Sequence, residues 1–405
     1  MVNNLIIVKV KVNGVPLNFL LDTGVDETLL IGLESNQEVF LKEVESVKLI
    51  GLGSNEPING LKSNGNTLEI GKLTSDEHIM YVVTDADLRF SATLGIAING
   101  ILGYHFFKNH FIKVDYEKRK LVVYNRKYFN KSRLVRRYAS IPISIEKSKP
   151  YILLETQILK NYRRDSLKYL IDTGNSSAMW LFKNHPKVDT ISNTKFNDYL
   201  GLGFSGPVSG FRTKINQLSL GSYQVKTPIA AFPEFESYAH LKMVDNRAGS
   251  IGSEILKRFT VFFDYADKAI YLRQNANFSS EFDYNKSGIH LQSEGFRLVK
   301  LPVRERKNGA TLTLSFGDRD VTIQYEYQLK PSYQIAYLRC DSPAERAGLH
   351  IGDVISSVDN IPTALLSLEQ VANLLKSDKE KTIDVEVDRD GVLMKFQFQL
   401  KNILD

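Results

Sequence analysis

The stretch Leu21-Asp22-Thr23-Gly24 decides the fold of this chain, because it recurs as Ile171-Asp172-Thr173-Gly174. The two aspartates lie 150 residues apart (172 − 22) in a sequence of 405 residues. Each follows a short apolar run and precedes a small hydroxyl residue and a glycine, the pattern of a buried strand that ends in a tight turn. A single copy would be interpreted as an ordinary Asx turn, so the recurrence carries the argument.

Four further motifs recur in the same order at offsets of 150 or 149 residues, which indicates an internal duplication. The matched motifs are Gly51-Leu52-Gly53 with Gly201-Leu202-Gly203, Leu68-Glu69-Ile70-Gly71 with Leu218-Ser219-Leu220-Gly221, Ile101-Leu102-Gly103 with Ser250-Ile251-Gly252, and Asp115-Tyr116 with Asp264-Tyr265. We therefore expect a first lobe over residues 1–137 and a second lobe over 138–280. The basic run Arg126–Arg137 between them is interpreted as a solvated connector.

Both lobes are expected to be mostly β, and the remainder of the chain forms a third domain. Short β-branched or aromatic runs bounded by turn residues predict strands in each lobe, with single helices near Phe106 and over Ser253–Arg258. Residues 281–405 differ, because capping boxes at Ser342 and Ser367 predict two helices and a later alternating pattern predicts a hairpin. This α+β domain contains a segment at about 294–328 that looks inserted.

Composition places the chain among globular proteins and excludes several functions. Hydrophobic residues make up 43% and charged residues 24%, and the net charge of +6 is too small to indicate nucleic acid. A single cysteine, Cys340, excludes an internal disulfide, and the seven histidines show no metal-binding spacing. We expect no metal, no other cofactor and no transmembrane segment.

Two Asp-Thr-Gly turns in duplicated lobes predict a shared site, because a pseudo-two-fold axis would bring Asp22 and Asp172 face to face. Two carboxylates at close range cannot both ionise, so one pKa rises and the pair holds a single proton. The ionised member can then activate water while the protonated member donates to a substrate carbonyl oxygen. This chemistry predicts amide hydrolysis without a covalent intermediate.

The doubled Asp-Thr-Gly, each copy followed about 80 residues later by a hydrophobic-Gly element, resembles the pepsin-like and retropepsin-like aspartic proteases. The resemblance implies two acid-protease barrel lobes with Asp22 and Asp172 as the catalytic pair. It assigns Thr23 and Thr173 to bonds between the loops and Gly24 and Gly174 to close approach. Ile101-Leu102-Gly103 and Ser250-Ile251-Gly252 would be the strands that support the aspartate loops.

The chain departs from these families after each Asp-Thr-Gly, where Val25 and Asn175 stand. Pepsin-like enzymes often carry a hydroxyl residue there, which donates to the aspartate. Without that donor the ionised form of Asp22 loses a stabilising contact. We therefore expect a pH optimum nearer neutral than that of pepsin.

The segment Ser342–Leu349, followed by Gly352-Asp353-Val354-Ile355, resembles the core of bacterial PDZ domains. A PDZ groove lies between a strand and the second helix and adds a peptide as an extra strand. Val371, Leu374 and Leu375 on that helix are candidates to line the groove or to fill the core. The carboxylate-binding loop is placed at Leu329–Ile335, which lacks a glycine pair.

The stretch Gly201–Gly206, GLGFSG, fits both a dinucleotide-binding turn and the peptide loop of PDZ domains. No helix is expected after Pro207, and the stretch lies inside the second lobe, so both interpretations fail. Its counterpart is Gly51–Gly53, and each glycine pair begins 29 residues beyond its aspartate (51 − 22 and 201 − 172). Gly51, Gly53, Gly201 and Gly203 are therefore candidates for a pair of flaps over the cleft.

The alternative function is a catalytically silent peptide-binding protein that uses the protease fold and the PDZ groove for recognition. A serine hydrolase is disfavoured, because Ser205 is followed by Gly206 and Pro207, out of register with Gly-x-Ser-x-Gly. The expected partners are polypeptide substrates and a peptide C-terminus at the PDZ-like groove, with a monomeric enzyme. The chain is either cytoplasmic or, as the family resemblance favours, exported to the periplasm or cell envelope after removal of a signal segment.

Overall fold

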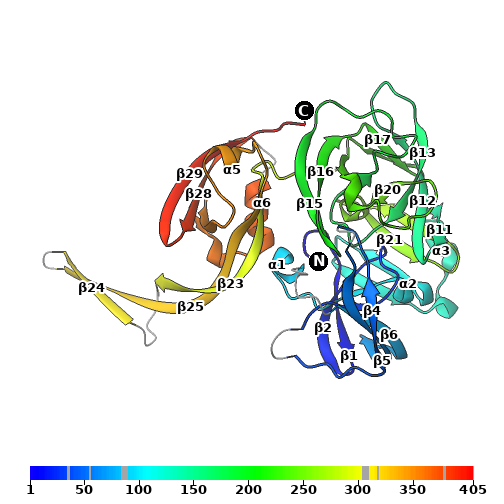
Figure 1. The fold of residues 1–405 in the computed structure, drawn as a ribbon, viewed down its shortest axis with the longest axis horizontal. Helices are drawn as coiled ribbons and strands as arrows, with labels where there is room; N and C mark the ends of the chain where they lie inside the picture. Colours follow the sequence, from blue (N-terminus) through cyan, green and yellow to red (C-terminus); the bar gives the residue numbers. More distant parts are fainter. Residues whose placement is uncertain are drawn as a thin grey trace. The chain divides into compact units, whose positions relative to one another are not determined.

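The structure is a computed structural model that describes residues 1–33, 37–53, 56–83, 90–302, 310–316, 319–376 and 380–404. It divides into two compact units, shown in Figure 1. The N-terminal unit comprises Met1–Ser91, Ile96–Asp283 and Asn402–Asp405, and the C-terminal unit comprises Tyr284–Lys401 with Ala92–Gly95. Both units are dominated by strands, which confirms the predicted mostly β fold.

The first lobe forms a seven-stranded sheet in the order β1-β2-β7-β3-β6-β5-β4. Its strands are β1 (Ile7–Val12), β2 (Val15–Leu21), β3 (Leu29–Leu30), β4 (Val44–Leu49), β5 (Ile58–Ile70), β6 (Leu73–Val83) and β7 (Gly100–Leu102), with helix α2 (Tyr104–Asn109). Helix α1 (Phe90–Leu94) begins in the N-terminal unit, and its residues from Ala92 on belong to the C-terminal unit. Leu17, Phe19, Leu20 and Leu21 are buried along β2, whereas Pro16 and Asn18 are more exposed. Because successive side chains of a strand point to opposite faces, the last three residues of β2 are covered on both faces of the sheet.

The second lobe repeats this plan in a ten-stranded sheet, with β13 and β20 in the places of β2 and β7. Its strands are β11 (Ser144–Glu146), β12 (Lys149–Gln157), β13 (Asp165–Ile171), β14 (Met179–Leu181), β15 (Phe196–Gly203), β16 (Gly206–Lys214), β17 (Gln217–Leu220), β18 (Tyr223–Lys226), β19 (Ile229–Pro233) and β20 (Arg247–Ile251), with helices η2 (Phe235–Ser237) and α4 (Ser253–Leu256). In both lobes the strand before Asp-Thr-Gly pairs in parallel with the hydrophobic-Gly strand.

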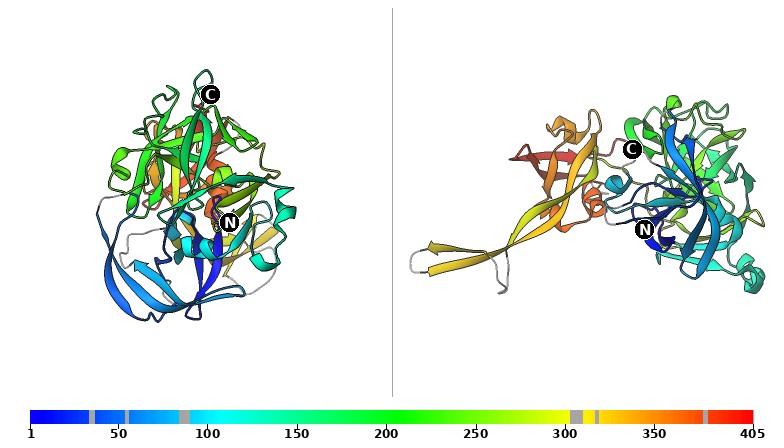
Figure 2. Two further views of the ribbon diagram at one scale, coloured as in Figure 1. Left: turned by 90° about the vertical axis from the view of Figure 1, so that its right-hand side faces the viewer. Right: turned by 60° about the horizontal axis from the view of Figure 1, so that its bottom comes forward.

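A third sheet joins the lobes, in the order β10-β22-β21-β8-β9. Its members are β8 (Phe111–Asp115), β9 (Lys120–Tyr124), β10 (Ala139–Pro142), β21 (Phe259–Asp264) and β22 (Ala269–Gln274). Strand β8 of the first lobe pairs with β21 of the second, and one large cluster of buried apolar side chains extends through both lobes. Figure 2 shows the first lobe (blue to cyan) and the second lobe (green) next to each other in two further views.

The connector between the lobes is largely exposed, as the sequence predicts, but it is folded and anchored. It folds into η1 (Arg126–Tyr128) and α3 (Lys131–Val135), whose Leu134 is buried. Arg126 and Lys131 form ion pairs with Asp264, whose side chain is 2% exposed. The basic residues therefore neutralise a buried carboxylate of the second lobe, which a charge pattern alone does not reveal.

The C-terminal unit packs two helices against a curved sheet. Its elements are β23 (Ile289–Pro302), β24 (Ala310–Phe316), β25 (Arg319–Leu338), α5 (Pro343–Arg346), β26 (Val354–Val358), β27 (Ile361–Pro362), η3 (Thr363–Leu365), α6 (Leu368–Lys376), β28 (Lys381–Arg389) and β29 (Val392–Leu400). The capping box predicted at Ser367 is complete, since Ser367 Oγ accepts from Gln370 N–H at 3.3 Å and Ser367 N–H donates to Gln370 Oε1 at 2.8 Å. At Ser342 the cap bond forms, since Ser342 Oγ accepts from Glu345 N–H at 3.2 Å, but Glu345 accepts from Asp341 N–H and not from that of Ser342.

In the segment that looked inserted, 294–328, the described residues extend β23 and β25 into a long antiparallel ribbon with β24 beside β25 (Figure 1). Residues 303–309 and 317–318 lie outside the described residues. Leu329–Ile335, where the sequence placed a carboxylate-binding loop, lies inside β25 and pairs with β23. That placement was wrong, because these residues pair with β23 through a register shift at Ser332–Tyr333 and form no loop. No described helix is long and apolar enough to cross a membrane.

Candidate active site

The two Asp-Thr-Gly turns are held in place by the hydrophobic-Gly strands beside them. Asp22 N–H donates to Leu102 O at 3.0 Å, and Asp172 N–H donates to Ile251 O at 2.9 Å. Each bond continues the parallel pairing of its lobe by one residue, so the aspartate turn starts where the strand pairing ends.

The threonines bind the two turns to each other across the lobes. Thr23 N–H donates to Thr173 Oγ1, and Thr173 N–H donates to Thr23 Oγ1, both at 3.0 Å. Each hydroxyl in turn donates to a carbonyl of the opposite lobe, from Thr23 to Ile171 O at 2.6 Å and from Thr173 to Leu21 O at 2.8 Å. Both threonines are fully buried, so these four bonds fix the relative position of the turns.

The glycines allow the two carboxylates to meet. A methyl group added at Gly174 would lie 2.1 Å from Asp22 Oδ2, and one added at Gly24 would lie 3.0 Å from Asp172 Oδ1. Each glycine thus faces the carboxylate of the other lobe, where a side chain would push the aspartates apart. The structure brings together Asp22, Asp172, both threonines and both glycines, as the sequence predicts for a shared site.

The electrostatics of the pair favour one proton shared between two half-buried carboxyl groups. The pKa of Asp22 is raised to about 8, first by burial and then by the negative charge of Asp172. Burial also raises the pKa of Asp172, but the nearby positive charge of Arg247 opposes that shift. Asp172 therefore ionises first and Asp22 keeps its proton near neutral pH.

The four flap candidates lie on two hairpins whose tips touch across the lobes. Gly51 and Gly53 follow β4, while Gly201 and Gly203 lie at the end of β15. Gly53 pairs with Ser205, whose N–H donates to the carbonyl oxygen of Leu52 at 2.8 Å.

Glycine is required at the tips because the two backbones approach so closely. A methyl group at Gly203 would lie 2.2 Å from Leu52 O, and one at Gly51 would lie 2.5 Å from Phe204 Cβ. His240, which the sequence did not single out, adds a bond of 2.8 Å from its Nε2 to Gly51 O. Leu52 itself packs against a small apolar cluster of the second lobe that includes Trp180.

Several residues near the aspartates carry no local motif and were missed from the sequence. Lys149 of the second lobe pairs with Asp26 of the first at 3.2 Å, and its charge lowers the pKa of both aspartates. Ser253 Oγ–H donates to Thr173 O at 3.1 Å and so supports the second turn from α4. These contacts join residues about 80 to 120 positions apart, beyond the reach of any sequence window.

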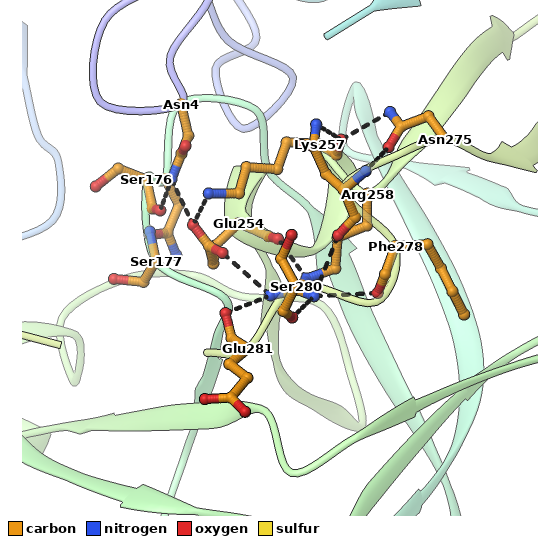
Figure 3. A network of polar contacts seen from close by, with 12 residues as sticks. Asn4, Ser176, Ser177, Glu254, Lys257, Arg258, Asn275, Phe278, Ser280 and Glu281 are labelled. Atoms are coloured by element: carbon orange, nitrogen blue, oxygen red, sulfur yellow. Dashed lines mark hydrogen bonds and ion pairs between the residues drawn. The ribbon is translucent and has the colours of Figure 1, made fainter. Parts of the chain in front are cut away.

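A buried arginine, Arg258, belongs to a polar network that reaches the loop after Asp172. Figure 3 shows Arg258, 1% exposed, with its guanidinium among backbone carbonyls of the segment 277–281 and beside Glu254. Glu254 accepts from Asn4 Nδ2 at 2.8 Å, and the same amide donates to Ser176 O at 3.2 Å, four residues beyond Asp172. Through Arg258, Glu254 and Asn4, the segment 277–281 at the end of the N-terminal unit is thereby linked to the loop that carries the second aspartate.

The PDZ candidates divide into two groups. Val371 and Leu375 are fully buried in the core of the C-terminal unit, whereas Leu374 is half-buried at the edge of that core. Helix α6 packs against β23, the edge strand of the sheet. Only Leu374 of the three therefore retains an accessible surface beside this strand.

The duplicated lobes and the doubled aspartate turn define the fold of an aspartic protease. A family model described as aspartyl protease matches residues 8–106, and one described as PDZ domain matches residues 334–389. A solved aspartic proteinase from Irpex lacteus is 12% identical, with 68% of this chain and 95% of that chain covered and a TM-score of 0.43. No curated protein matches the chain. The chain combines an aspartyl protease domain with a PDZ domain, and the predicted family resemblance is confirmed.

Proposed function

We propose that this protein is an aspartic endopeptidase in which Asp22 and Asp172 hydrolyse a peptide bond. The observation that carries the proposal is the meeting of two half-buried carboxyl groups whose pKa values are pushed apart. Ionised Asp172 takes a proton from water as the water attacks the carbonyl carbon, and protonated Asp22 donates to the carbonyl oxygen. The resulting diol collapses as Asp172 gives its proton to the leaving nitrogen, the C–N bond breaks, and Asp22 takes a proton back from a diol hydroxyl.

The hairpin tips would act as flaps that open to admit an extended peptide and then close over it. Their contact across the lobes supports this role, since Gly53 pairs with Ser205 and Leu52 packs against the second lobe. The PDZ domain would bind a peptide beside β23 and α6, with Leu374 at the groove. This module would present unfolded substrates or bind a chain end.

The test is digestion of an unfolded protein by the pure full chain across pH 4 to 9, with products identified by mass spectrometry. The control is the double variant Asp22→Asn/Asp172→Asn. Internal cleavages by the wild type alone would support an endopeptidase. Binding of the unfolded protein by both forms, without cleavage by either, would instead establish the silent peptide-binding protein.

A further inference from the structure

Arg247 is a cation whose charge acts on Asp172 and which forms an ion pair with no carboxylate among the described residues. It begins β20, the strand whose last residue, Ile251, accepts from the N–H of Asp172. Its Nε–H donates to Gly249 O at 3.1 Å, so the side chain runs along β20 towards Asp172. Its guanidinium carbon lies over the Phe182 ring, 5.2 Å from the ring centre, in a cation–π contact.

Arg247 takes part in no ion pair within the described part of the chain, and the charge of Asp172 acts on it only through space. A guanidinium has five N–H donors, and Gly249 O occupies one of them. The other poorly exposed arginines of the N-terminal unit face acids, Arg212 with Asp198 at 2.7 Å and Arg258 with Glu254 at 3.3 Å. Arg247, although half-buried, forms no ion pair with any described residue.

Keeping an unpaired guanidinium half out of water costs free energy, unless a ligand provides the missing anion. The titratable groups that face Arg247 do not fill this role. Tyr151 is buried, which raises the pKa of its hydroxyl and keeps it neutral. Asp172 feels the charge of Arg247 without forming an ion pair with it.

We propose that Arg247 determines substrate specificity by binding a carboxylate of the peptide next to the aspartate pair. This inference rests on the proposed function and names the substrate class, a peptide with an acidic group close to the cleaved bond. The fork of N–H donors matches a carboxylate in a bidentate geometry, which lysine does not reproduce. The acidic group is a glutamate or aspartate side chain or the C-terminal carboxylate of the peptide.

The test compares kcat/KM for matched peptides with the full chain. A first series of amidated peptides carries one glutamate each, at a different position around the cleaved bond. A second series carries glutamine at the same positions. A third peptide has glutamine and a free C-terminal carboxylate. Wild type should cleave one acidic peptide about 10- to 100-fold faster than its glutamine counterpart, as expected for one charged hydrogen-bonded pair.

Variants then assign the preference to Arg247. Arg247→Gln should bring the ratio between acidic and neutral peptides close to one, and Arg247→Lys should keep part of it. Arg164→Gln removes an exposed positive charge of the same lobe and should leave the ratio as in wild type. Equal cleavage of acidic and neutral peptides by wild type, or an unchanged ratio in Arg247→Gln, would overturn the proposal.

Binding measurements separate this inference from the proposed function. Fluorescence anisotropy gives Kd for the same peptides with Asp22→Asn, which lacks one member of the pair but retains Arg247. If no peptide is cleaved, tighter binding of an acidic peptide still supports the role of Arg247 while the protease proposal fails. Equal Kd values for acidic and neutral peptides would count against Arg247.

Discussion

Thr173→Val provides a quantitative test of how the two lobes are locked at the aspartates. Valine has nearly the shape of threonine but removes the hydroxyl, which accepts from Thr23 N–H at 3.0 Å and donates to Leu21 O at 2.8 Å. Both partners then stay buried without a hydrogen bond. At about 1 to 3 kcal/mol for each unpaired group, the loss in unfolding free energy should be about 2 to 6 kcal/mol.

Thr173→Ser is the matched control, because it keeps both bonds and loses one methyl group, at a cost of about 1 kcal/mol. Unfolding in urea can be followed by the emission of Trp180, the single tryptophan of the sequence, which lies in β14 and reports on the N-terminal unit. A loss for Thr173→Val no greater than that for Thr173→Ser would refute the reasoning. Thr23→Val and Thr23→Ser should repeat the pattern from the first lobe.

Three further predictions address pH, the hairpin tips and the PDZ domain. Since Asp22 must keep its proton and its pKa is about 8, kcat/KM should fall as pH rises through 8, and a pH–rate profile that peaks below about pH 3 contradicts this. Gly203→Val places a methyl group 2.2 Å from a carbonyl oxygen of the opposite hairpin, so it should raise KM or lower kcat without unfolding the protein. Gly32→Val, where the added group meets open space, is the control, and unchanged kinetics for Gly203→Val would refute the flap role. Arg389→Met leaves Asp353, 1% exposed, without its ion partner. The unfolding free energy of the C-terminal unit, measured by hydrogen exchange, should fall by about 3 to 5 kcal/mol. Because this pairing lowers the pKa of Asp353, the penalty should shrink as pH falls through that pKa.

Much of the fold could be predicted because the duplication repeats local signals. Asp22 and Asp172 both end apolar strands, and two equivalent turns in duplicated lobes imply a shared site. The helix from Pro343 was predictable from its capping residue, since the cap bond of Ser342 joins residues only three positions apart. Such features depend on short stretches of sequence, where residue type largely decides the geometry.

The remaining site residues depend on contacts between distant parts of the chain. Arg247 follows no motif, and only the pairing of β20 with β13 brings its side chain towards Asp172. His240 reaches Gly51 from 189 positions away. The error over Leu329–Ile335 has a similar origin, because the residues that pair with this segment and make it a strand lie about 30 to 45 positions earlier, in β23.

The most direct test of the central claim is kcat/KM of the single variants Asp22→Asn and Asp172→Asn on one peptide, beside wild type and the double variant. If two lobes of one chain supply a single proton-sharing pair, each single variant should lose at least about 1,000-fold, and the double variant should lose no more than either. Activity of one single variant within about tenfold of wild type would contradict the account, because one aspartate would then be dispensable.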